Sequence, residues 1–219
     1  MTIHLSPSQR KVLKKVGESG ATSAAHGLSK MLGRKINVEV PEVKFIDYRN
    51  VPASLGGGES IVAAIYFHVL GALSGSVVLV FPFKEALQLA RWLVGGRKEK
   101  RLNRLAQSAL KELGNITAGS YLTALSEIGR MRLIHSVPGF TLDMLQASLD
   151  GILALEAFKA EQLIVLRAEF MADKRRIQGH LLFLPDPQGL SSLLRALSPP
   201  RKSRSQPAQS LLSTRGREI

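Results

Sequence analysis

The segment Ser108–Phe140, SALKELGNITAGSYLTALSEIGRMRLIHSVPGF, has the apolar spacing of a long amphipathic helix followed by the start of a strand. Within the helical part, Ser108, Glu112 and Asn115 stand at positions i, i+4 and i+7. A helix has 3.6 residues per turn, so these three side chains share one face. The remaining apolar positions can then face a sheet: Leu110, Leu113, Ala118, Leu122 and Leu125. The segment therefore predicts one helix with a polar face and an apolar face.

Two glycines, Gly114 and Gly119, accompany this polar face, and each costs a helix roughly 1 kcal/mol relative to alanine. Such a cost is acceptable where another group must approach the backbone closely. Two interpretations follow. In the first, Glu112 and Asn115 are solvated surface residues and the glycines are spacers for helix packing. In the second, the polar face carries chemistry.

A second copy of the segment lies 97 positions earlier in the chain, without any gap. The stretch 12–41 aligns with the stretch 109–138, and nine pairs of identical residues support the match. These pairs are Leu13 and Leu110, Lys14 and Lys111, Gly17 and Gly114, Ala21 and Ala118, Ser23 and Ser120, Leu28 and Leu125, Ser29 and Ser126, Val40 and Val137, and Pro41 and Pro138. The sequence therefore predicts an internal duplication.

The duplication predicts the fold class. Each half is expected to contain a long helix, a strand that ends near its proline, two long strands and a short helix. We expect an α+β fold with pseudo-two-fold symmetry, in which an antiparallel-rich sheet is covered by two long helices. Residues 1–198 are predicted to form a single domain of two repeats, about 8–95 and 105–197, and residues 199–219 a basic, disordered tail.

Composition excludes several classes of protein. The 219 residues include 45% hydrophobic residues, enough for a substantial core, and no cysteine, which excludes disulfides and thiolate metal sites. The N-terminus has no apolar region typical of a signal peptide, and the longest apolar runs are broken by Gly, Ser, His and charged residues. These runs are expected to be buried strands. The sequence thus predicts a soluble, cytoplasmic protein without a membrane partner.

The formal net charge of +13 raises the alternative of a nucleic-acid partner, because clustered Lys and Arg bind phosphate backbones. Much of the positive charge lies in three stretches: QRKVLKK near the N-terminus, GRKEKRLNR between the halves, and the tail. No zinc-finger spacing, RNA-binding aromatic motif or helix-turn-helix accompanies them. The net charge is the only feature that favours a nucleic-acid partner. An acidic protein surface is a simpler partner for these basic stretches.

The polar residues of the second copy resemble a known family signature. Ser108, Glu112 and Asn115, followed after 22 intervening residues by Pro138, match the pattern of the CheC/CheX/FliY family of CheY-phosphate phosphatases. That pattern is an Asp or Ser, three residues, Glu, two residues, Asn, 22 residues and Pro. The resemblance covers residues 8–197 and is nearest to CheC, which is also duplicated.

The first copy departs from this pattern at its three polar positions. Lys11 replaces the Asp or Ser, Lys15 replaces the Glu, and Glu18 replaces the Asn, whereas Pro41 is retained. The small and apolar residues are shared by both copies, so packing explains them. The chain is therefore expected to carry one intact site and one degenerate site. Lys11 and Lys15 are either solvated cations or part of a basic surface that attracts an acidic partner.

The resemblance implies an activity and a role for each residue. The implied substrate is the phospho-aspartate of a CheY-type receiver domain, which holds its own Mg²⁺, so no cofactor of the phosphatase itself is expected. Asn115 is the implied catalytic residue that orients the attacking water, and Glu112 is implied to engage the lysine of the receiver's active site. Ser108 and Pro138 are accessory, the first for docking or helix shape and the second for structure.

The resemblance also leaves two non-catalytic alternatives open. The same fold occurs in the middle domain of the flagellar switch protein FliM, which binds CheY or neighbouring switch subunits without the catalytic residues. CheC proteins can also bind the receptor deamidase CheD. The intact Glu112 and Asn115 favour the enzyme over a binding module.

Overall fold

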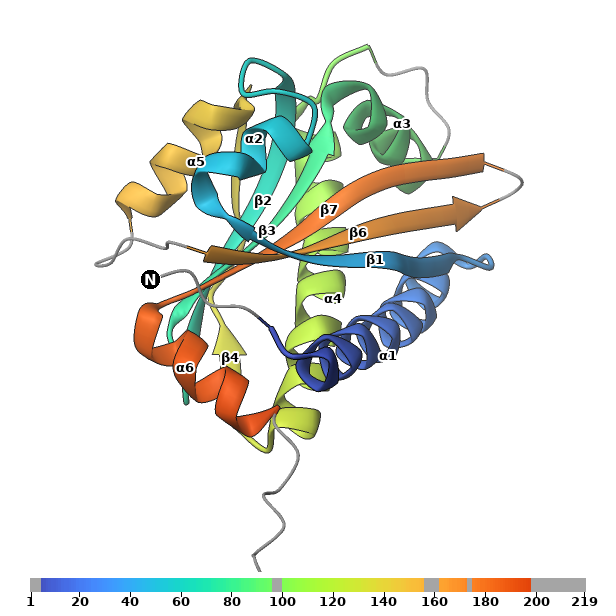
Figure 1. Ribbon diagram of the computed structural model, residues 1–219. Coiled ribbons are helices and arrows are strands. Elements are labelled where there is room, and N and C mark those ends of the chain that lie inside the picture. The colour runs from blue at the N-terminus through green and yellow to red at the C-terminus, as the bar shows by residue number, and fades with distance from the viewer. Residues whose placement is uncertain (1–4, 96–99, 156–161, 173–174, 198–219) are drawn as a thin grey trace, which may run out of the picture.

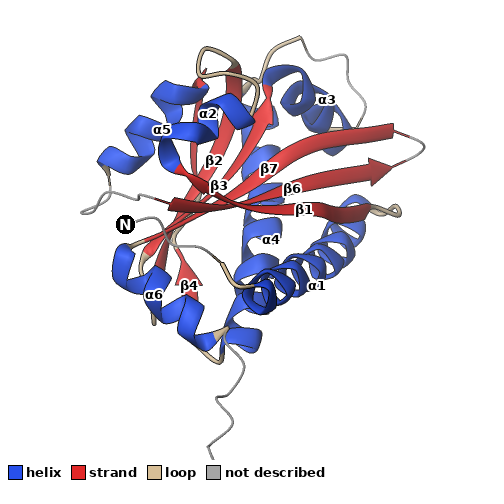
Figure 2. Cartoon of the chain, in the orientation of Figure 1, coloured by secondary structure: helices blue, strands red, loops and turns tan. Residues whose placement is uncertain are grey.

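The computed structural model describes residues 5–95, 100–155, 162–172 and 175–197. They form a mixed fold of long helices packed on a curled antiparallel sheet, as the sequence predicts (Figures 1 and 2). Seven strands form this sheet in the order β1-β6-β7-β3-β2-β4, and β5 pairs with β2 beside β4. The predicted tail and residues 96–99 of the connector lie outside the described residues.

The two halves contain related elements in the same order. The first half consists of α1 (Pro7–Leu32), β1 (Asn37–Asp47), the short helices η1 (Tyr48–Asn50) and α2 (Val51–Ser54), β2 (Ile61–Gly71), β3 (Gly75–Pro82) and α3 (Phe83–Leu93). The second half consists of α4 (Arg104–Gly129), β4 (Leu133–His135), β5 (Gly139–Met144), α5 (Leu145–Ala154), β6 (Gln162–Ala172), β7 (Arg175–Pro185) and α6 (Pro187–Ala196). Both long helices, α1 and α4, have 26 residues.

The strands of the two halves are exchanged at the edges of the sheet, where each half pairs with a strand of the other. β1 pairs with β6 of the second half, and β2 pairs with β4 and β5 of the second half. β3 and β7 pair at the centre, where the two halves meet. Each half therefore supplies the outer strand for the other, so the sheet is complete only when both are present.

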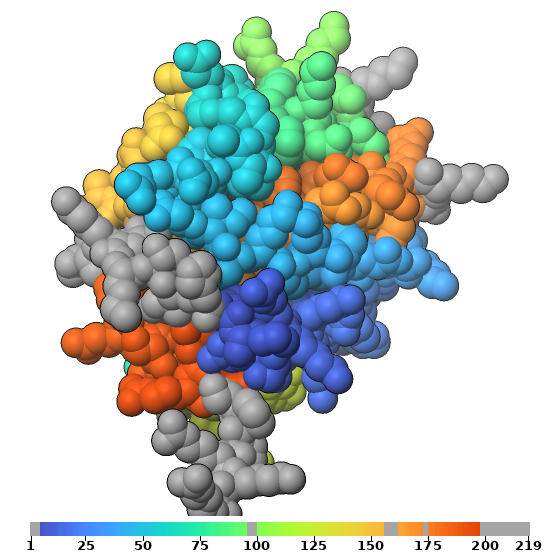
Figure 3. Space-filling model, in the orientation of Figure 1, coloured from blue at the N-terminus to red at the C-terminus, as the bar shows by residue number. Residues whose placement is uncertain are grey.

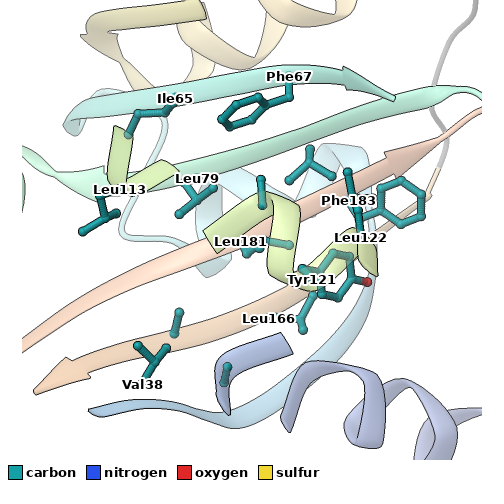
Figure 4. Packing of buried hydrophobic residues seen from close by; sticks show 14 of the residues in the cluster. Val38, Ile65, Phe67, Leu79, Leu113, Tyr121, Leu122, Leu166, Leu181 and Phe183 are labelled. Atoms are coloured by element: carbon teal, nitrogen blue, oxygen red, sulfur yellow. The ribbon is translucent and has the colours of Figure 1, made fainter. Parts of the chain in front are cut away.

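One face of the sheet packs against α1, α3, α4 and α6 and forms the larger part of the core. Leu113, Tyr121 and Leu122 of α4 point toward this face, where Ile65 and Leu181 lie in the sheet (Figure 4). Leucines of α6 and alanines of α3 extend the same core around the helices. The core thus holds α4 against the sheet along its apolar positions.

The opposite face of the sheet is also covered, which differs from the expected arrangement with helices on one side. Leu145, Leu149 and Ile152, on one face of α5, pack with Val51 of α2 over apolar side chains of the central strands. The reason is that β3, β6 and β7 are apolar on both faces, and such strands must be buried on both sides. The sequence pattern predicts no helix in the segments that form α2 and α5.

The expected end of the first strand near Pro41 is also wrong. β1 continues through Pro41 to Asp47, with a bulge between Glu39 and Glu42 where two residues oppose one of β6. β1 is an edge strand and lies at the surface across the front of the molecule (Figure 3), where a proline is tolerated because its missing N–H is not needed. Among the described helices, none is long and apolar enough to span a bilayer.

Candidate active site on helix α4

Helix α4 begins at a well-formed cap. The side chain of Asn103 accepts a hydrogen bond of 2.9 Å from the backbone N–H of Ala106, which satisfies one free donor of the first turn. The helix ends where Arg130 adopts a left-handed conformation with φ of 50°. Between these ends Leu110, Leu113 and the apolar residues that follow are buried against the sheet. The opposite face of α4 is thereby turned outward.

The three predicted residues lie on this outward face, which we call the α4 stripe: Ser108, Glu112 and Asn115. Ser108 and Glu112 are exposed, and Asn115 is half-buried. Their side chains make no hydrogen bond or ion pair with the described part of the chain. A carboxylate, a carboxamide and a hydroxyl are thus presented together with their bonding capacity unused.

The two glycines of α4 are explained by packing, as the first interpretation held for them. A Cβ on Gly114 would lie 2.8 Å from Cγ2 of Ile65 in β2, and a Cβ on Gly119 would lie 3.3 Å from Nε2 of His135 in β4. The groups that approach the helix closely are therefore the protein's own side chains. The glycines bring α4 near the sheet and leave the α4 stripe on the outward face of the helix.

Pro138 lies in the three-residue break between β4 and β5 and is half-buried. Just before it, Ser136 maintains the pairing with β2 through both its backbone and its side chain. Its N–H donates to the carbonyl of His68 (2.9 Å), and its hydroxyl accepts from the N–H of His68 (3.0 Å). Among the described contacts, Pro138 makes no hydrogen bond with Glu112 or Asn115, and its structural role stays a prediction.

The structure adds His135, which belongs to no motif of the sequence, to the neighbourhood of the α4 stripe. Its ring packs edge-on against Phe67, with centroids 5.2 Å apart, and its Nδ1 lies 2.9 Å from the carbonyl oxygen of Ser136. Its Nε2 faces α4 at Gly119, one turn beyond Asn115. No sequence spacing could indicate this, because the contact depends on how β4 packs against α4.

The corresponding stripe of the first copy is charged. Lys11, Lys15 and Glu18 are exposed on α1, and Glu18 lies 3.8 Å from Lys14 in an i,i+4 ion pair. Pro41 is exposed within the bulge of β1 and does not interrupt the strand. The first copy therefore has no carboxamide at the position of Asn115, and its strand β1 is continuous where the second copy has a break between β4 and β5.

The two stripes lie on opposite sides of the crossing between α1 and α4. Gly20 faces the backbone of Tyr121, with its absent Cβ 2.9 Å from the Cα, and Gly27 faces Ile116. The two helices are therefore antiparallel, so residues later in α1 lie beside residues earlier in α4. Lys15 precedes Gly20 and lies toward the C-terminal end of α4, away from Glu112. This arrangement favours the interpretation of Lys11 and Lys15 as solvated cations.

The glycine-rich turn before β2, the turn before α6 and the buried Trp92 have structural explanations. Gly56 and Gly57 adopt φ of 104° and 102° in the turn before β2, and Asp186 accepts from the N–H of Gly189 at the start of α6. Trp92 is buried, with the guanidinium of Arg34 5.6 Å from its ring centroid. Within the described ranges, no group of histidines and carboxylates is arranged to hold a metal ion.

Comparison with known proteins agrees with this geometry. The model of the CheC-like family matches residues 105–142, the segment that contains the whole α4 stripe and Pro138. The chain is 34% identical to the CheY-P phosphatase CheC of Bacillus subtilis over 195 residues, which cover 86% of this chain and 93% of that protein. The chain belongs to the CheC-like family.

Solved structures show how widely this CheC-like fold is shared. FliY of Thermotoga maritima superimposes with a TM-score of 0.73 at 21% identity, covering 89% of this chain and 98% of that structure. The FliM middle domain of H. pylori superimposes with a TM-score of 0.60 at 13% identity, covering 88% and 99%. At such identities these similarities establish the fold alone.

Proposed function

We propose that this protein is a phosphatase that hydrolyses the phospho-aspartate of a CheY-type response regulator in chemotaxis signalling. The observation that carries the proposal is the α4 stripe, where the side chains of Glu112 and Asn115 face outward and make no hydrogen bond or ion pair with the described residues. The chain that presents them is 34% identical to a CheY-P phosphatase over most of its length. The substrate is then a protein, so an open helix face suits the reaction better than a deep pocket would.

Asn115 is the residue proposed to act on the reacting atoms. Hydrolysis needs a water molecule in line with the bond that breaks between phosphorus and the aspartyl oxygen. A carboxamide can accept from and donate to this water, carries no charge that repels the phosphoryl oxygens, and does not titrate near neutral pH. Orienting the water lowers the entropic part of the barrier, and an effect on the order of 10² in rate is reasonable for one such group.

Glu112 is proposed to dock rather than to react. Its carboxylate would repel a phosphoryl group unless a cation lay between them, and the family resemblance supplies that cation as the lysine of the receiver's active site. Glu112 and Asn115 are three residues apart on one helix face, so a contact through Glu112 fixes where Asn115 enters the receiver. The Mg²⁺ belongs to the receiver and not to this chain.

The proposal is tested by the rate at which a phosphorylated CheY-type receiver loses its phosphoryl group. The wild-type chain should accelerate the loss, and Asn115→Ala should reduce the acceleration by about 10². Thr123→Ala changes an exposed residue of the same helix and serves as the matched control. If the wild type binds the receiver without any acceleration, the protein is a binding module, as the FliM-like fold would allow.

Two further expectations depend on the same proposal. A phosphatase of a CheY-type receiver must meet its substrate in the cytoplasm, which is where we place this protein. CheD is the second proposed partner, on the basis of the family resemblance. Co-purification with CheD, in the presence and absence of the phosphorylated receiver, tests this second expectation.

A further inference from the structure

Large apolar side chains are exposed beside the α4 stripe. Ile61 begins β2, Leu142 and Met144 lie on β5, and Leu105 lies in the first turn of α4. Their exposed fractions are 49% for Ile61, 42% for Leu142, 44% for Met144 and 55% for Leu105. We call these four residues the apolar edge patch. Exposed apolar side chains that gather in one place indicate an interaction surface more strongly than scattered ones do.

Strand pairing places the patch on the same side of the sheet as α4. Ile61 is opposite Met144, and Ala63 is opposite Leu142, so these residues share a face with Ile65, which contacts Gly114 of α4. Gly114 of α4 contacts Ile65 of β2. Gly119, further along α4, lies beside His135, which pairs with Val69 further along β2. α4 therefore runs in the direction of β2, and its N-terminal turns point toward Ile61.

The patch is continuous with the α4 stripe. Leu105 precedes Ser108 by three residues and Glu112 by seven, so it extends the stripe at its N-terminal end. β5 pairs with β2, and its other edge is open within the described part of the sheet. Apolar side chains, an open strand edge and the two proposed active residues thus form one surface.

The first copy offers a comparison inside the same molecule. At the repeat offset of 97, Phe45 replaces Leu142, Asp47 replaces Met144 and Ser8 replaces Leu105, and the residue opposite Asp47 is Gln162 instead of an isoleucine. Asp47 is bound to Arg49 at 3.0 Å, and Phe45, Asp47 and Gln162 line a hollow of about 490 Å³. The exposed apolar patch therefore occurs beside the intact stripe and is absent beside the degenerate one.

We infer that the apolar edge patch is the surface on which the receiver domain packs while the α4 stripe reaches its phosphorylated pocket. The inference rests on the proposed function and names the docking surface of the same site. The partner must present an apolar surface next to an acidic pocket. The exposed cations Arg101 and Arg104, at the start of α4, add attraction for the acidic part.

The test uses the double variant Leu142→Gln and Met144→Gln in the full chain. Loss of two buried apolar contacts should raise KM for the phosphorylated receiver about ten-fold or more, with kcat within two-fold of the wild type. The matched control is Leu70→Gln with Ile134→Gln, a similarly exposed pair whose residues face each other on the opposite side of the sheet. The control variant should retain the wild-type KM.

A binding measurement separates this inference from the proposed function. Both double variants are made in the Asn115→Ala background, and their affinity for the receiver activated with beryllium fluoride is measured. Selective loss of affinity in the Leu142 and Met144 variant supports the docking surface even if no phosphatase activity is found. Equal affinity in both variants overturns it. So does a change from dimer to monomer with KM unchanged, since the patch would then bind a second copy of the chain.

Discussion

The two long helices of this protein have the same length and the same pattern of small and apolar residues, yet their outward faces differ completely. On α4 the outward face presents Glu112 and Asn115, which have no side-chain partner among the described residues, beside exposed leucines and a methionine. On α1 the equivalent face presents lysines, and its neighbouring strand presents Asp47 bound to Arg49. The comparison shows that the fold requires the inner faces of both helices and leaves the outer faces free to specialise.

The largest effect is expected when the faces are exchanged. Glu112→Lys with Asn115→Glu gives α4 the residues of α1 and should reduce the hydrolysis rate of the phosphorylated receiver by about 10². Glu112 is exposed and Asn115 is half-buried on the outward face of α4, away from the core, so the urea midpoint of unfolding should stay close to that of the wild type. A rate loss accompanied by a large drop in stability would contradict the separation of inner and outer faces.

The reciprocal exchange sharpens the comparison further. Lys11→Ser, Lys15→Glu and Glu18→Asn, made together in the Asn115→Ala background, rebuild the polar pattern on α1. We expect recovery of less than about a tenth of the wild-type rate, because the first copy lacks the apolar edge patch and has Val38 at the position of His135. Full recovery would show that the pattern of polar residues is sufficient by itself.

A smaller effect, on stability, is expected where the two helices cross. Gly20→Val adds a side chain whose Cβ would lie 2.9 Å from the Cα of Tyr121, and this backbone cannot move without separating the helices. We expect unfolding in urea to show a loss of about 1–3 kcal/mol. Ser23→Val, at an exposed position of the same helix, is the control and should be near neutral.

The smallest effect concerns the lysines of the first copy. Lys11 and Lys15 lie on the far side of the crossing between α1 and α4, away from Glu112. The double variant Lys11→Ala with Lys15→Ala should therefore change the hydrolysis rate at low salt by less than about two-fold. Arg104→Ala with Lys111→Ala removes cations next to the α4 stripe and should lower this rate about three- to ten-fold, with the difference vanishing at high salt. Equal effects of the two variants would restore the interpretation of Lys11 and Lys15 as docking residues.

Sequence alone predicted the features that depend on local periodicity and on the repeat. The spacing of Ser108, Glu112 and Asn115 placed them on one helix face, and the offset of 97 predicted the paired long helices. It did not predict α5, the continuation of β1 beyond Pro41, or the position of His135. Each of these depends on what a segment packs against: α5 covers apolar strands of both halves, and His135 contacts α4 because β4 joins β2.

The close contacts of α4 also set the angle at which the helix is held about its own axis. Ile65 occupies the space left by Gly114, the His135 ring lies against Gly119, and Gly20 of α1 lies against the backbone of Tyr121. Rotation of α4 about its axis in either direction would cause a steric clash with one of these groups. The direction in which the Cα–Cβ bond of Asn115 leaves the helix is therefore set before a partner arrives, so association need not supply the free energy to orient the helix. The repeat with the degenerate stripe therefore still has a structural task, because its helix α1 helps to fix the orientation of the helix that carries the proposed active residues.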